Sequence, residues 1–390
     1  MDILNTAFGR LHLVRSPHKP SNVKAAANLR AWDAADELLL DYLDDNKLVK
    51  NTDRVLIIND GFGALACSLA TYHPCSWNDS SVSLNAATHN YASNDLGNGQ
   101  HKILEKLAST TDFEGTADLV LIKVPKTLAL LEHQLLALRG HITGETTIVA
   151  ACMVKYLEKS YLQLFEKIIG DTSVSLAVKK ARLIFPTVDQ ERKPYQSPYP
   201  VKVDIDELGI STINYANVFS REKLDIGSRF FIENMKNLPA TRSIIDLGCG
   251  NGVLGIVAKR LFPAAKITFV DESYMAIASA KASFEHFIGS MITPEYLCNF
   301  VVSDSLDQAG NEKVELVLCN PPFHQNNTVG DDIAWKMFTQ SKHILTQGGR
   351  IWIVGNRHLN YHLKLKQLFG NCRNVASNKK FVILEAINQP

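Results

Sequence analysis

The chain has 390 residues, which is enough for two domains that each bury a core. Hydrophobic residues make up 46% and charged residues 21%, a balance that is typical of a soluble globular protein. The formal net charge of +1 excludes attraction of a nucleic acid by an overall positive field, so such a partner would need local basic patches.

Cysteine usage and the N-terminal residues indicate where the protein works. The seven cysteines include no CxxC pair and no metal-like spacing with histidine, which predicts reduced thiols and no metal site. The chain starts MDILNTAFGR, without the basic and apolar regions of a signal peptide, and no apolar run approaches 18 residues. We therefore expect a cytoplasmic protein with no membrane contact.

Helices and strands alternate in the first half of the chain. An amphipathic helix is expected over 24–45, followed by a buried strand over 54–60, a glycine turn and a helix over 64–70. Further strands are expected at 118–125 and 146–151, and further helices at 127–139 and 156–169. This alternation predicts βαβ units and a mainly parallel sheet.

Four prolines then fall close together and predict a break between domains. They are Pro186, Pro194, Pro198 and Pro200, with charged residues among them. We interpret 186–200 as a linker, which divides the chain into a domain at 1–185 and a second domain at 201–390.

The second half resumes the alternation after a predicted hairpin of two strands at 201–205 and 210–215. A helix should follow Phe219, with Asp225 as its N-cap. Strands are expected at 243–247, 266–271, 299–303, 314–319 and 350–355, helices at 253–261, 274–288, 332–345 and 361–369, and a final hairpin at 374–377 and 380–387. The sequence therefore predicts an α/β fold for this half as well.

The tetrapeptide Asn320-Pro321-Pro322-Phe323 follows one of these strands and points to a particular chemistry. An exocyclic base amine or an amide nitrogen delocalises its lone pair, so a site must accept hydrogen bonds from its N–H groups to make it nucleophilic. The side-chain oxygen of Asn320 and the adjacent backbone carbonyl can do this. The prolines keep that backbone extended and remove competing N–H donors, and Phe323 offers a flat face for a base.

A glycine turn after the strand at 243–247 predicts a cofactor site. Gly248, Gly250 and Gly252 allow close backbone approach and positive φ angles. The turn also matches the dinucleotide pattern G-x-G-x-x-G through Gly255, but that pattern alone is weak. Asp246 beside the turn would repel a pyrophosphate and attract an amino group, which favours S-adenosylmethionine over a nicotinamide cofactor.

Two further carboxylates follow the next strands. Asp271 ends its strand 25 residues after Asp246 and can accept hydrogen bonds from two ribose hydroxyls. Asp304 follows the third strand and could accept from an adenine amine, although a turn or cap residue is the alternative.

The two halves look like copies of one domain. Residues 119–126 align without a gap on 316–323, and 59–65 align on 248–254. Lys123 stands where Asn320 stands, and an ammonium group cannot accept a hydrogen bond from an amine. Asn59 replaces the first glycine, and Ile57 occupies the place of Asp246. We therefore expect the N-terminal copy to be inactive in this chemistry.

These motifs together resemble the class I S-adenosylmethionine-dependent methyltransferases that act on exocyclic or amide nitrogens. With Phe219-Ser220-x4-Asp225-x-Gly227-Ser228-Arg229 and the degenerate first copy, nearly the whole chain is similar to the bacterial ribosomal RNA guanine-N2 methyltransferases. It is most similar to the RlmG family, which acts on 23S rRNA, with the RsmC type that acts on 16S rRNA as a near relative.

The resemblance implies two tandem Rossmann-like domains, a degenerate N-terminal one and a catalytic C-terminal one, and methylation of a guanine N2 amine in 23S rRNA. It implies three sets of site residues: Asn320, Pro321, Pro322 and Phe323 as catalytic; Asp246, Gly248, Cys249, Gly250, Gly252, Asp271, Asp304 and Asn320 as cofactor-binding; and Phe323, Ser220 and Arg229 as substrate-binding.

Other residues near the motif have plainer interpretations. His324 could act as a general base, but a methylated guanine N2 can lose its proton to water, so RNA contact or simple exposure is the preferred interpretation. Asp331 and Asp332 are expected to cap the following helix rather than to bind a metal. Residues 356–380 contain six basic and no acidic residues, which makes them a candidate for RNA contact.

Several other functions stay open at this point. A 16S rRNA guanine-N2, a DNA adenine-N6 or a protein glutamine-N5 methyltransferase could use the same tetrapeptide. A non-enzymatic RNA-binding factor is the alternative from another class, and a nicotinamide-dependent oxidoreductase rests only on the glycine pattern.

Overall fold

The computed structural model describes residues 2–15, 29–96, 104–193, 195–289, 298–322 and 328–389. The chain forms two compact units and passes from the first to the second between Pro198 and Tyr199, inside the range predicted as a linker. Pro186, at the start of that range, is still the last residue of a strand in the first unit. No helix of the described residues is long and apolar enough to cross a membrane.

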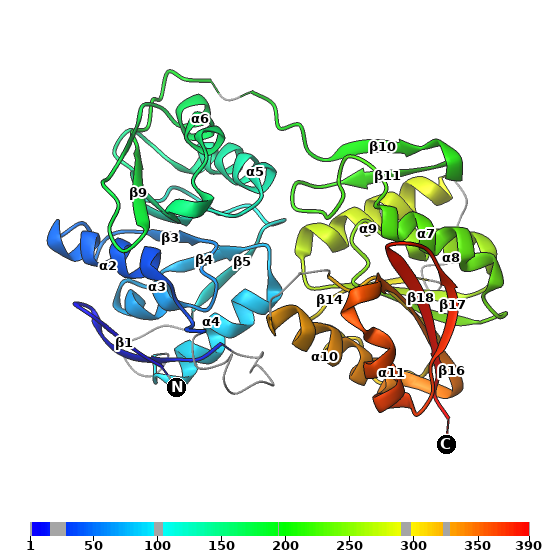
Figure 1. Ribbon diagram of the computed structural model, residues 1–390. Helices are drawn as coiled ribbons and strands as arrows, with labels where there is room; N and C mark the ends of the chain where they lie inside the picture. The colour runs from blue at the N-terminus through cyan, green and yellow to red at the C-terminus, as the bar shows by residue number, and fades with distance from the viewer. Residues whose placement is uncertain are drawn as a thin grey trace. The chain divides into compact units, whose positions relative to one another are not determined.

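The N-terminal unit contains a seven-stranded sheet (Figure 1). In spatial order its strands are β5 (Glu105–Ala108), β4 (Cys75–Asn78), β3 (Val55–Ile58), β6 (Leu119–Lys123), β7 (Thr147–Met153), β9 (Ala181–Pro186) and β8 (Thr172–Val174). The first five strands are parallel, and β9 and β8 add an antiparallel edge. A separate hairpin pairs β1 (Asp2–Thr6) with β2 (Gly9–Leu13).

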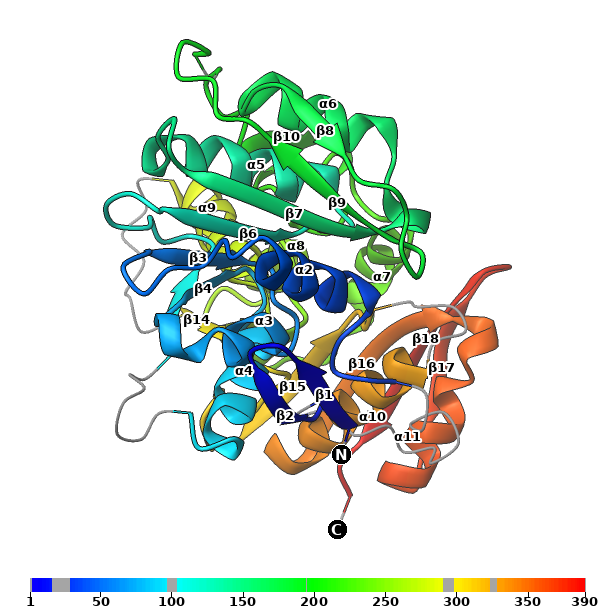
Figure 2. The same ribbon diagram turned by 90° about the vertical axis from the view of Figure 1, so that its left-hand side faces the viewer.

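Helices cover both faces of this sheet because its central strands are apolar on both sides. Its α-helices are α2 (Ala34–Asp45), α3 (Ala64–Ser68), α4 (Ser81–Ser93), α5 (Leu128–Leu138) and α6 (Lys159–Ile168). Val55 and Ile57 belong to the core shared with α2 and α3, whereas Leu56 and Ile58 belong to the core shared with α5 and α6. Figure 2 shows these two layers of helices on either side of the strands.

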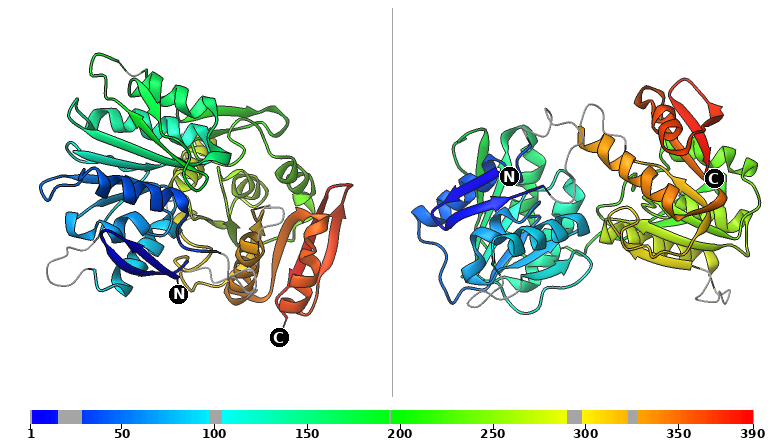
Figure 3. Two further views of the ribbon diagram at one scale, coloured as in Figure 1. Left: turned by 60° about the vertical axis from the view of Figure 1, so that its left-hand side comes forward. Right: turned by 90° about the horizontal axis from the view of Figure 1, so that it is seen from below.

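The C-terminal unit repeats this arrangement. Its sheet has the order β14 (Cys298–Val302), β13 (Lys266–Asp271), β12 (Ser243–Leu247), β15 (Val314–Cys319), β16 (Leu345–Asn356), β18 (Phe381–Ile387) and β17 (Arg373–Ser377). Its α-helices are α7 (Ile226–Asn234), α8 (Val253–Leu261), α9 (Tyr274–Ile288), α10 (Thr328–Ile344) and α11 (Tyr361–Phe369). The hairpin of β10 (Val201–Ile205) and β11 (Ile210–Asn214) precedes them, and β17 and β18 close one edge next to α11 (Figure 3).

The fold confirms the prediction of two tandem Rossmann-like domains, since each strand of one sheet has a counterpart in the other. The register agrees with the predicted alignment of the halves. Ile57 lies opposite Leu121 in the first sheet, and Asp246 lies opposite Leu318 in the second. Short 3₁₀ turns connect the elements: η1 (Ala70–Tyr72), η2 (Arg139–His141), η3 (Val154–Tyr156), η4 (Asp206–Leu208), η5 (Met235–Asn237) and η7 (Arg357–Leu359).

Some predicted boundaries were wrong. The helix predicted over 24–45 begins at Ala34, because the carboxylate of Asp33 accepts hydrogen bonds from the first-turn amides and starts the helix there; residues 24–28 lie outside the described part of the chain. The helix predicted over 332–345 begins at Thr328, so Asp331 lies in its first turn instead of capping it. Asp331 pairs there with Lys364 of α11 at 2.7 Å.

Candidate functional site

The predicted site residues gather at one edge of the C-terminal sheet. Strands β14, β13, β12 and β15 are parallel, so their carboxyl ends lie at the same edge. Asp271 is the last residue of β13, Asn320 directly follows β15, and the glycine turn directly follows β12. In open parallel sheets this is the edge at which ligands bind.

Backbone conformation makes the turn after β12 dependent on glycine. Gly248, Gly250 and Gly252 have φ angles of 70°, 54° and 80°, which side chains other than glycine rarely adopt. A Cβ on Gly252 would lie 3.0 Å from Ala280 Cβ, so α8 could not start so close to α9 with a larger residue. The amides of Gly248 and Cys249 donate to the carbonyl of Val270 and hold the turn on β13.

Asp246 supports this turn from beneath. Its side chain has no exposed surface, and its Oδ2 accepts a hydrogen bond of 2.8 Å from the amide of Gly255 in α8. Burial raises the pKa of this carboxyl group to about 8. Its other oxygen has no hydrogen-bond partner among the described residues. Asp246 therefore holds the loop against α8, and its direct contact with a ligand stays a prediction.

Asp271 and Asp304 differ in how they are held. The two oxygens of Asp271 accept from the amides of Gly250 at 3.0 Å and Ser273 at 3.1 Å, which fixes a partly exposed carboxylate beside the glycine turn. Asp304 is buried and forms an ion pair of 2.8 Å with Lys336 of α10. The carboxylate of Asp304 is therefore already paired with the Lys336 ammonium group, and its contact with an adenine amine stays a prediction.

Asn320 has its amide fixed at one end. Its Nδ2 donates to Ser228 Oγ at 3.0 Å, while its buried Oδ1 has no partner in the part of the chain that the structure describes. Pro321 is buried and Pro322 is exposed. The oxygen predicted to accept from an amine is therefore held without a competing donor from the described chain. Phe323 and His324 lie outside the described residues, so base stacking and proton transfer by them stay predictions.

Two predicted substrate residues have partners away from Asn320. Ser220, at a φ of 57°, donates to the carbonyl of Lys223 at 2.7 Å. Arg229 pairs with Glu207 of η4 at 2.5 Å. Their contacts with a cofactor or a base stay predictions.

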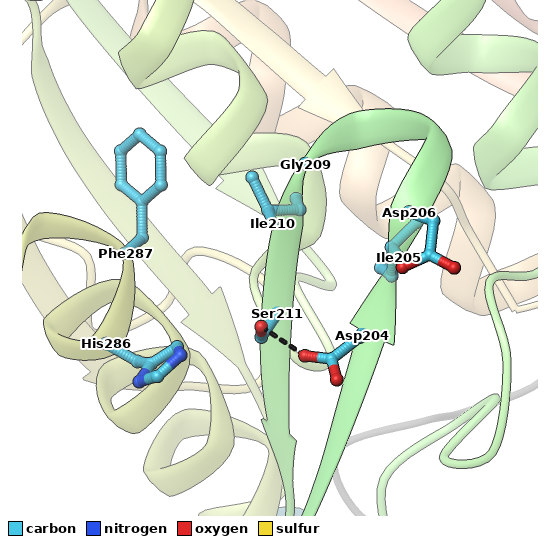
Figure 4. A pocket seen from close by; sticks show the side chains of 8 residues that line it. All are labelled: Asp204, Ile205, Asp206, Gly209, Ile210, Ser211, His286 and Phe287. Atoms are coloured by element: carbon cyan, nitrogen blue, oxygen red, sulfur yellow. Dashed lines mark hydrogen bonds between the residues drawn. The ribbon is translucent and has the colours of Figure 1, made fainter.

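A pocket of about 270 Å³ lies between the β10–β11 hairpin and the end of α9, and none of the predicted site residues lines it. Figure 4 shows its polar lining residues, Asp204, Asp206, Ser211 and His286; Ser211 donates to Asp204 at 2.6 Å. The predicted chemistry does not use this pocket.

Sequence reasoning did not identify Ser228 as the hydrogen-bond partner of Asn320. The residue lies in the first turn of α7, where the carboxylate of Asp225 accepts from its backbone amide at 3.0 Å. The predicted N-cap at Asp225 was a usable signal, because a cap fixes the backbone amide three residues later. What the sequence could not show is the contact to Asn320, which is 92 residues away.

In the N-terminal unit, polar side chains that bond to one another stand at the positions that correspond to Gly248 and Asn320. Asn59 takes the place of Gly248 and has nearly the same φ, 65°. Its side-chain amide donates to the carbonyl of Lys123 at 3.1 Å and to Gln134 at 2.9 Å. In the C-terminal unit the corresponding carbonyl is that of Asn320, and Gly248 has no side chain to cover it. The side chain of Asn59 thus occupies a position at which Gly248 has no side chain.

The acceptor position is filled as well. Lys123 forms ion pairs with Asp33 at 2.7 Å and Asp36 at 2.8 Å, at the start of α2. Asp60 takes over the support given by Asp246: it is buried, accepts from the amides of Gly63, Leu65 and Ala66, and has its pKa raised to about 6 by burial. The Lys123 ammonium group is thus bound by two carboxylates, and the Asp60 carboxylate by three backbone amides, all within the N-terminal unit.

Register also identifies the counterparts of the other two carboxylates. Asn78, which ends β4, corresponds to Asp271, and Thr110 corresponds to Asp304. Both N-terminal residues are uncharged, so the carboxylates predicted to hold a ribose and an adenine are missing at the equivalent positions. These replacements agree with the prediction that the N-terminal copy is inactive in methyl transfer.

The strand order, the glycine turn and the carboxylate at the end of the next strand define a class I S-adenosylmethionine-dependent methyltransferase. Residues 209–385 match the family model described as methyltransferase small domain, and residues 1–190 match that of the RLMG N-terminal domain.

Full-length relatives identify the family. The chain is 45% identical over 388 residues to the ribosomal RNA large subunit methyltransferase G of Stutzerimonas stutzeri strain A1501, an alignment that covers 99% of this chain and 100% of the relative. The enzyme of the same name from Pseudomonas aeruginosa strain UCBPP-PA14 is also 45% identical over 388 residues, with the same coverage. The chain belongs to the ribosomal RNA large subunit methyltransferase G family.

A solved structure shares the whole architecture. The T. thermophilus 16S rRNA N2 methyltransferase (RsmC), in complex with AdoMet and guanosine, superposes with a TM-score of 0.74 over 100% of this chain and 98% of that one. The TM-score confirms the tandem fold. Because the two sequences are only 18% identical, the likeness shows the fold alone.

Proposed function

We propose that the C-terminal unit transfers a methyl group from S-adenosylmethionine to the exocyclic N2 amine of a specific guanine in 23S rRNA. The observation that carries the proposal is the buried Oδ1 of Asn320, which has no partner within the described chain. The backbone carbonyl of the same residue lies next to Gly248 of the glycine turn. The name of the full-length relatives, large subunit methyltransferase, supports 23S rRNA as the substrate. A ribosomal substrate in turn favours a cytoplasmic protein.

The residues fit both reactants. Gly248, Gly250 and Gly252 leave the turn without side chains, and a Cβ on Gly250 would meet nothing within 4 Å, so a cofactor can approach the backbone there. The fixed carboxylate of Asp271 suits a pair of ribose hydroxyls. Bound S-adenosylmethionine supplies an electrophilic methyl group on a sulfonium, so the protein mainly has to position the amine. Cys249 is buried, and burial raises the pKa of its thiol, so it packs in the turn as an uncharged group.

Asn320 would activate the amine by accepting its hydrogen bonds. The Oδ1 of Asn320 and the carbonyl of Pro321 accept from the two N–H groups of guanine N2, which draws the lone pair out of the ring system. Nitrogen then bonds to the methyl carbon as the carbon–sulfur bond breaks and its electron pair stays on sulfur. The extra proton on nitrogen passes to water. A guanine within a helix would first have to be extruded.

Basic residues near the same edge of the sheet offer a surface for the RNA backbone. β16 is parallel to β15, so Arg357, just after β16, lies at the edge that carries Asn320. The amide of Arg357 donates to the carbonyl of Lys380 at 3.0 Å, which brings it next to the turn that holds Lys379. We infer that these three exposed cations contact phosphates; Lys364 and Arg373 of the same segment are paired with Asp331 and Glu385.

This surface can be tested by charge reversal. The double variant Lys379→Glu, Lys380→Glu should raise the KM for RNA and leave the cofactor affinity unchanged. The slope of log K for RNA binding against log salt concentration should become shallower, by the amount expected for the loss of roughly two phosphate contacts. Reversal of Lys236 and Lys202, exposed in the same unit, is the control. An unchanged KM and salt slope would show that RNA binds elsewhere.

The proposed reaction is tested by incubation of the protein with methyl-labelled S-adenosylmethionine and separated 23S rRNA, 16S rRNA, DNA and protein fractions. The proposal expects label in 23S rRNA. Label in 16S rRNA, in DNA or in protein would instead support a small-subunit guanine, an adenine N6 or a glutamine N5 substrate. RNA binding with no label in any fraction would indicate a non-enzymatic factor. The N-terminal unit is proposed to serve RNA docking, stability or both.

A further inference from the structure

We propose that Ser228 is a positioning residue that fixes the orientation of the Asn320 amide, so that its oxygen and not its nitrogen faces the target amine. The inference rests on the proposed function of Asn320. An asparagine side chain has two ends of nearly the same shape, one a hydrogen-bond acceptor and the other a donor. If the amide were reversed, its NH₂ group would face the NH₂ group of guanine, and two donors cannot activate one another.

The geometry around Ser228 suits this task. Its hydroxyl oxygen accepts from Asn320 Nδ2 at 3.0 Å, and only 7% of the residue is exposed, so little water competes for the bond. The backbone amide of Ser228 is tied separately to the carboxylate of Asp225 at 3.0 Å. The cap therefore holds the position of residue 228, while its side chain is left to hold Asn320.

The N-terminal copy supports the pairing of these two positions. Lys123 occupies the position of Asn320, and Asp36 occupies that of Ser228, three residues after the N-cap Asp33. There Lys123 Nζ lies 2.8 Å from Asp36 Oδ1. Both copies thus join the residue at the carboxyl end of β15 or β6 to the first turn of the helix that comes before the parallel strands, α7 or α2. In each copy the helix residue accepts the hydrogen bond. In the C-terminal unit the Asn320 amide donates to the Ser228 hydroxyl, and in the N-terminal unit the Lys123 ammonium group donates to the Asp36 carboxylate.

A hydroxyl can also donate, so the orientation must be tested with a residue that only accepts. Ser228→Ala removes the acceptor, frees the amide to rotate and should lower kcat about tenfold or more, the effect of losing one net hydrogen bond of about 1.5 kcal/mol. The KM values for cofactor and RNA should change less than about threefold, because binding does not use this bond. In Ser228→Asp the new carboxyl group only accepts hydrogen bonds once it is ionised, so this variant is assayed at a pH high enough to ionise a buried carboxyl group. Under those conditions it should keep the Asn320 oxygen outward and retain more of kcat than Ser228→Ala.

Two results would overturn the inference: a wild-type kcat for Ser228→Ala, or an equal loss of kcat in the Ala and Asp variants. Thermal unfolding of both variants shows whether α7 is kept, as expected when the cap uses only the backbone of residue 228. In an Asn320→Ala background, Ser228→Ala should have no further effect on kcat, since the pair acts as a unit. Failure of the proposed function itself is recognised separately, as full activity of Asn320→Ala alone.

Discussion

The predicted role of the Asp271 carboxylate in cofactor binding can be tested with the substitution Asp271→Asn, which has nearly the same shape. In Asp271→Asn an acceptor oxygen becomes an NH₂ group and the negative charge is lost. The fold already accommodates this residue at the equivalent place: the Oδ1 of Asn78 accepts from the amide of Ser80 at 3.0 Å, as the Oδ1 of Asp271 accepts from Ser273. The Nδ2 of Asn78 donates to the carbonyl of Asp60 at 3.1 Å, whereas the Oδ2 of Asp271 accepts from the amide of Gly250 in the glycine turn.

The size of the effect follows from the bonds that are lost. With Asn at 271, one of the two side-chain atoms can no longer accept from a ribose hydroxyl, and the other accepts without a charge. A hydrogen bond to a charged group contributes about 1.5–3 kcal/mol. The Kd for S-adenosylmethionine should therefore rise about 10- to 150-fold.

Isothermal titration calorimetry measures this Kd directly. Asp206→Asn, an exposed carboxylate on the β10–β11 hairpin, is the matched control and should bind normally. Thermal unfolding checks that loss of the bond from Gly250 has not opened the turn. A Kd within about threefold of wild type, with an intact fold, would refute the assignment of Asp271 to the cofactor.

Three further predictions follow from the two sheets. Asn320→Ala should lower kcat roughly 10²–10³-fold at near-normal cofactor affinity, the loss typical when one preorganised hydrogen-bonding group is removed, and steady-state kinetics with calorimetry would show this. Because the pKa of Asp246 is raised to about 8, the folded chain keeps a proton that the unfolded chain releases above about pH 4. The free energy of unfolding should therefore fall as the pH rises from about 4 to about 8, and it should fall less in Asp246→Asn. Urea unfolding near both of these pH values measures the difference. Lys123→Ala leaves the buried Asp36 without its cation and should destabilise the N-terminal unit by about 3–5 kcal/mol in urea unfolding, while one cofactor still binds per chain; two per chain would contradict the filled N-terminal site.

Much of the fold could be predicted because its local signals agree. The strands at Ser243–Leu247, Lys266–Asp271 and Val314–Cys319 and the helices at Val253–Leu261 and Tyr274–Ile288 have the predicted bounds. The strands are mainly apolar, and the two helices are amphipathic and begin directly after Gly252 and Ser273. The strand Cys75–Asn78 was missed, because four residues with two polar side chains give no such pattern. The β1–β2 hairpin was missed for the same reason.

The site was predictable as a set of motifs, but not as a set of contacts. The glycine turn, Asp271 and Asn320, all singled out from the sequence, lie at the same edge of the sheet. The partners of these groups come from far along the chain, as Ser228 does for Asn320 and Lys336 for Asp304. Asp60 shows the same limit, since its role as the buried support of the first turn depends on three amides that only the folded helix presents.

The central claim is that Asn320 drives methylation of a guanine N2 amine in 23S rRNA. The most direct measurement is nucleoside mass spectrometry of 23S rRNA from a strain that lacks this gene, complemented with the wild-type protein or with Asn320→Ala. We predict one N2-methylguanosine that returns with the wild-type protein and stays absent with the variant. Its return with both proteins, or the return of a different methylated nucleoside, would contradict the claim.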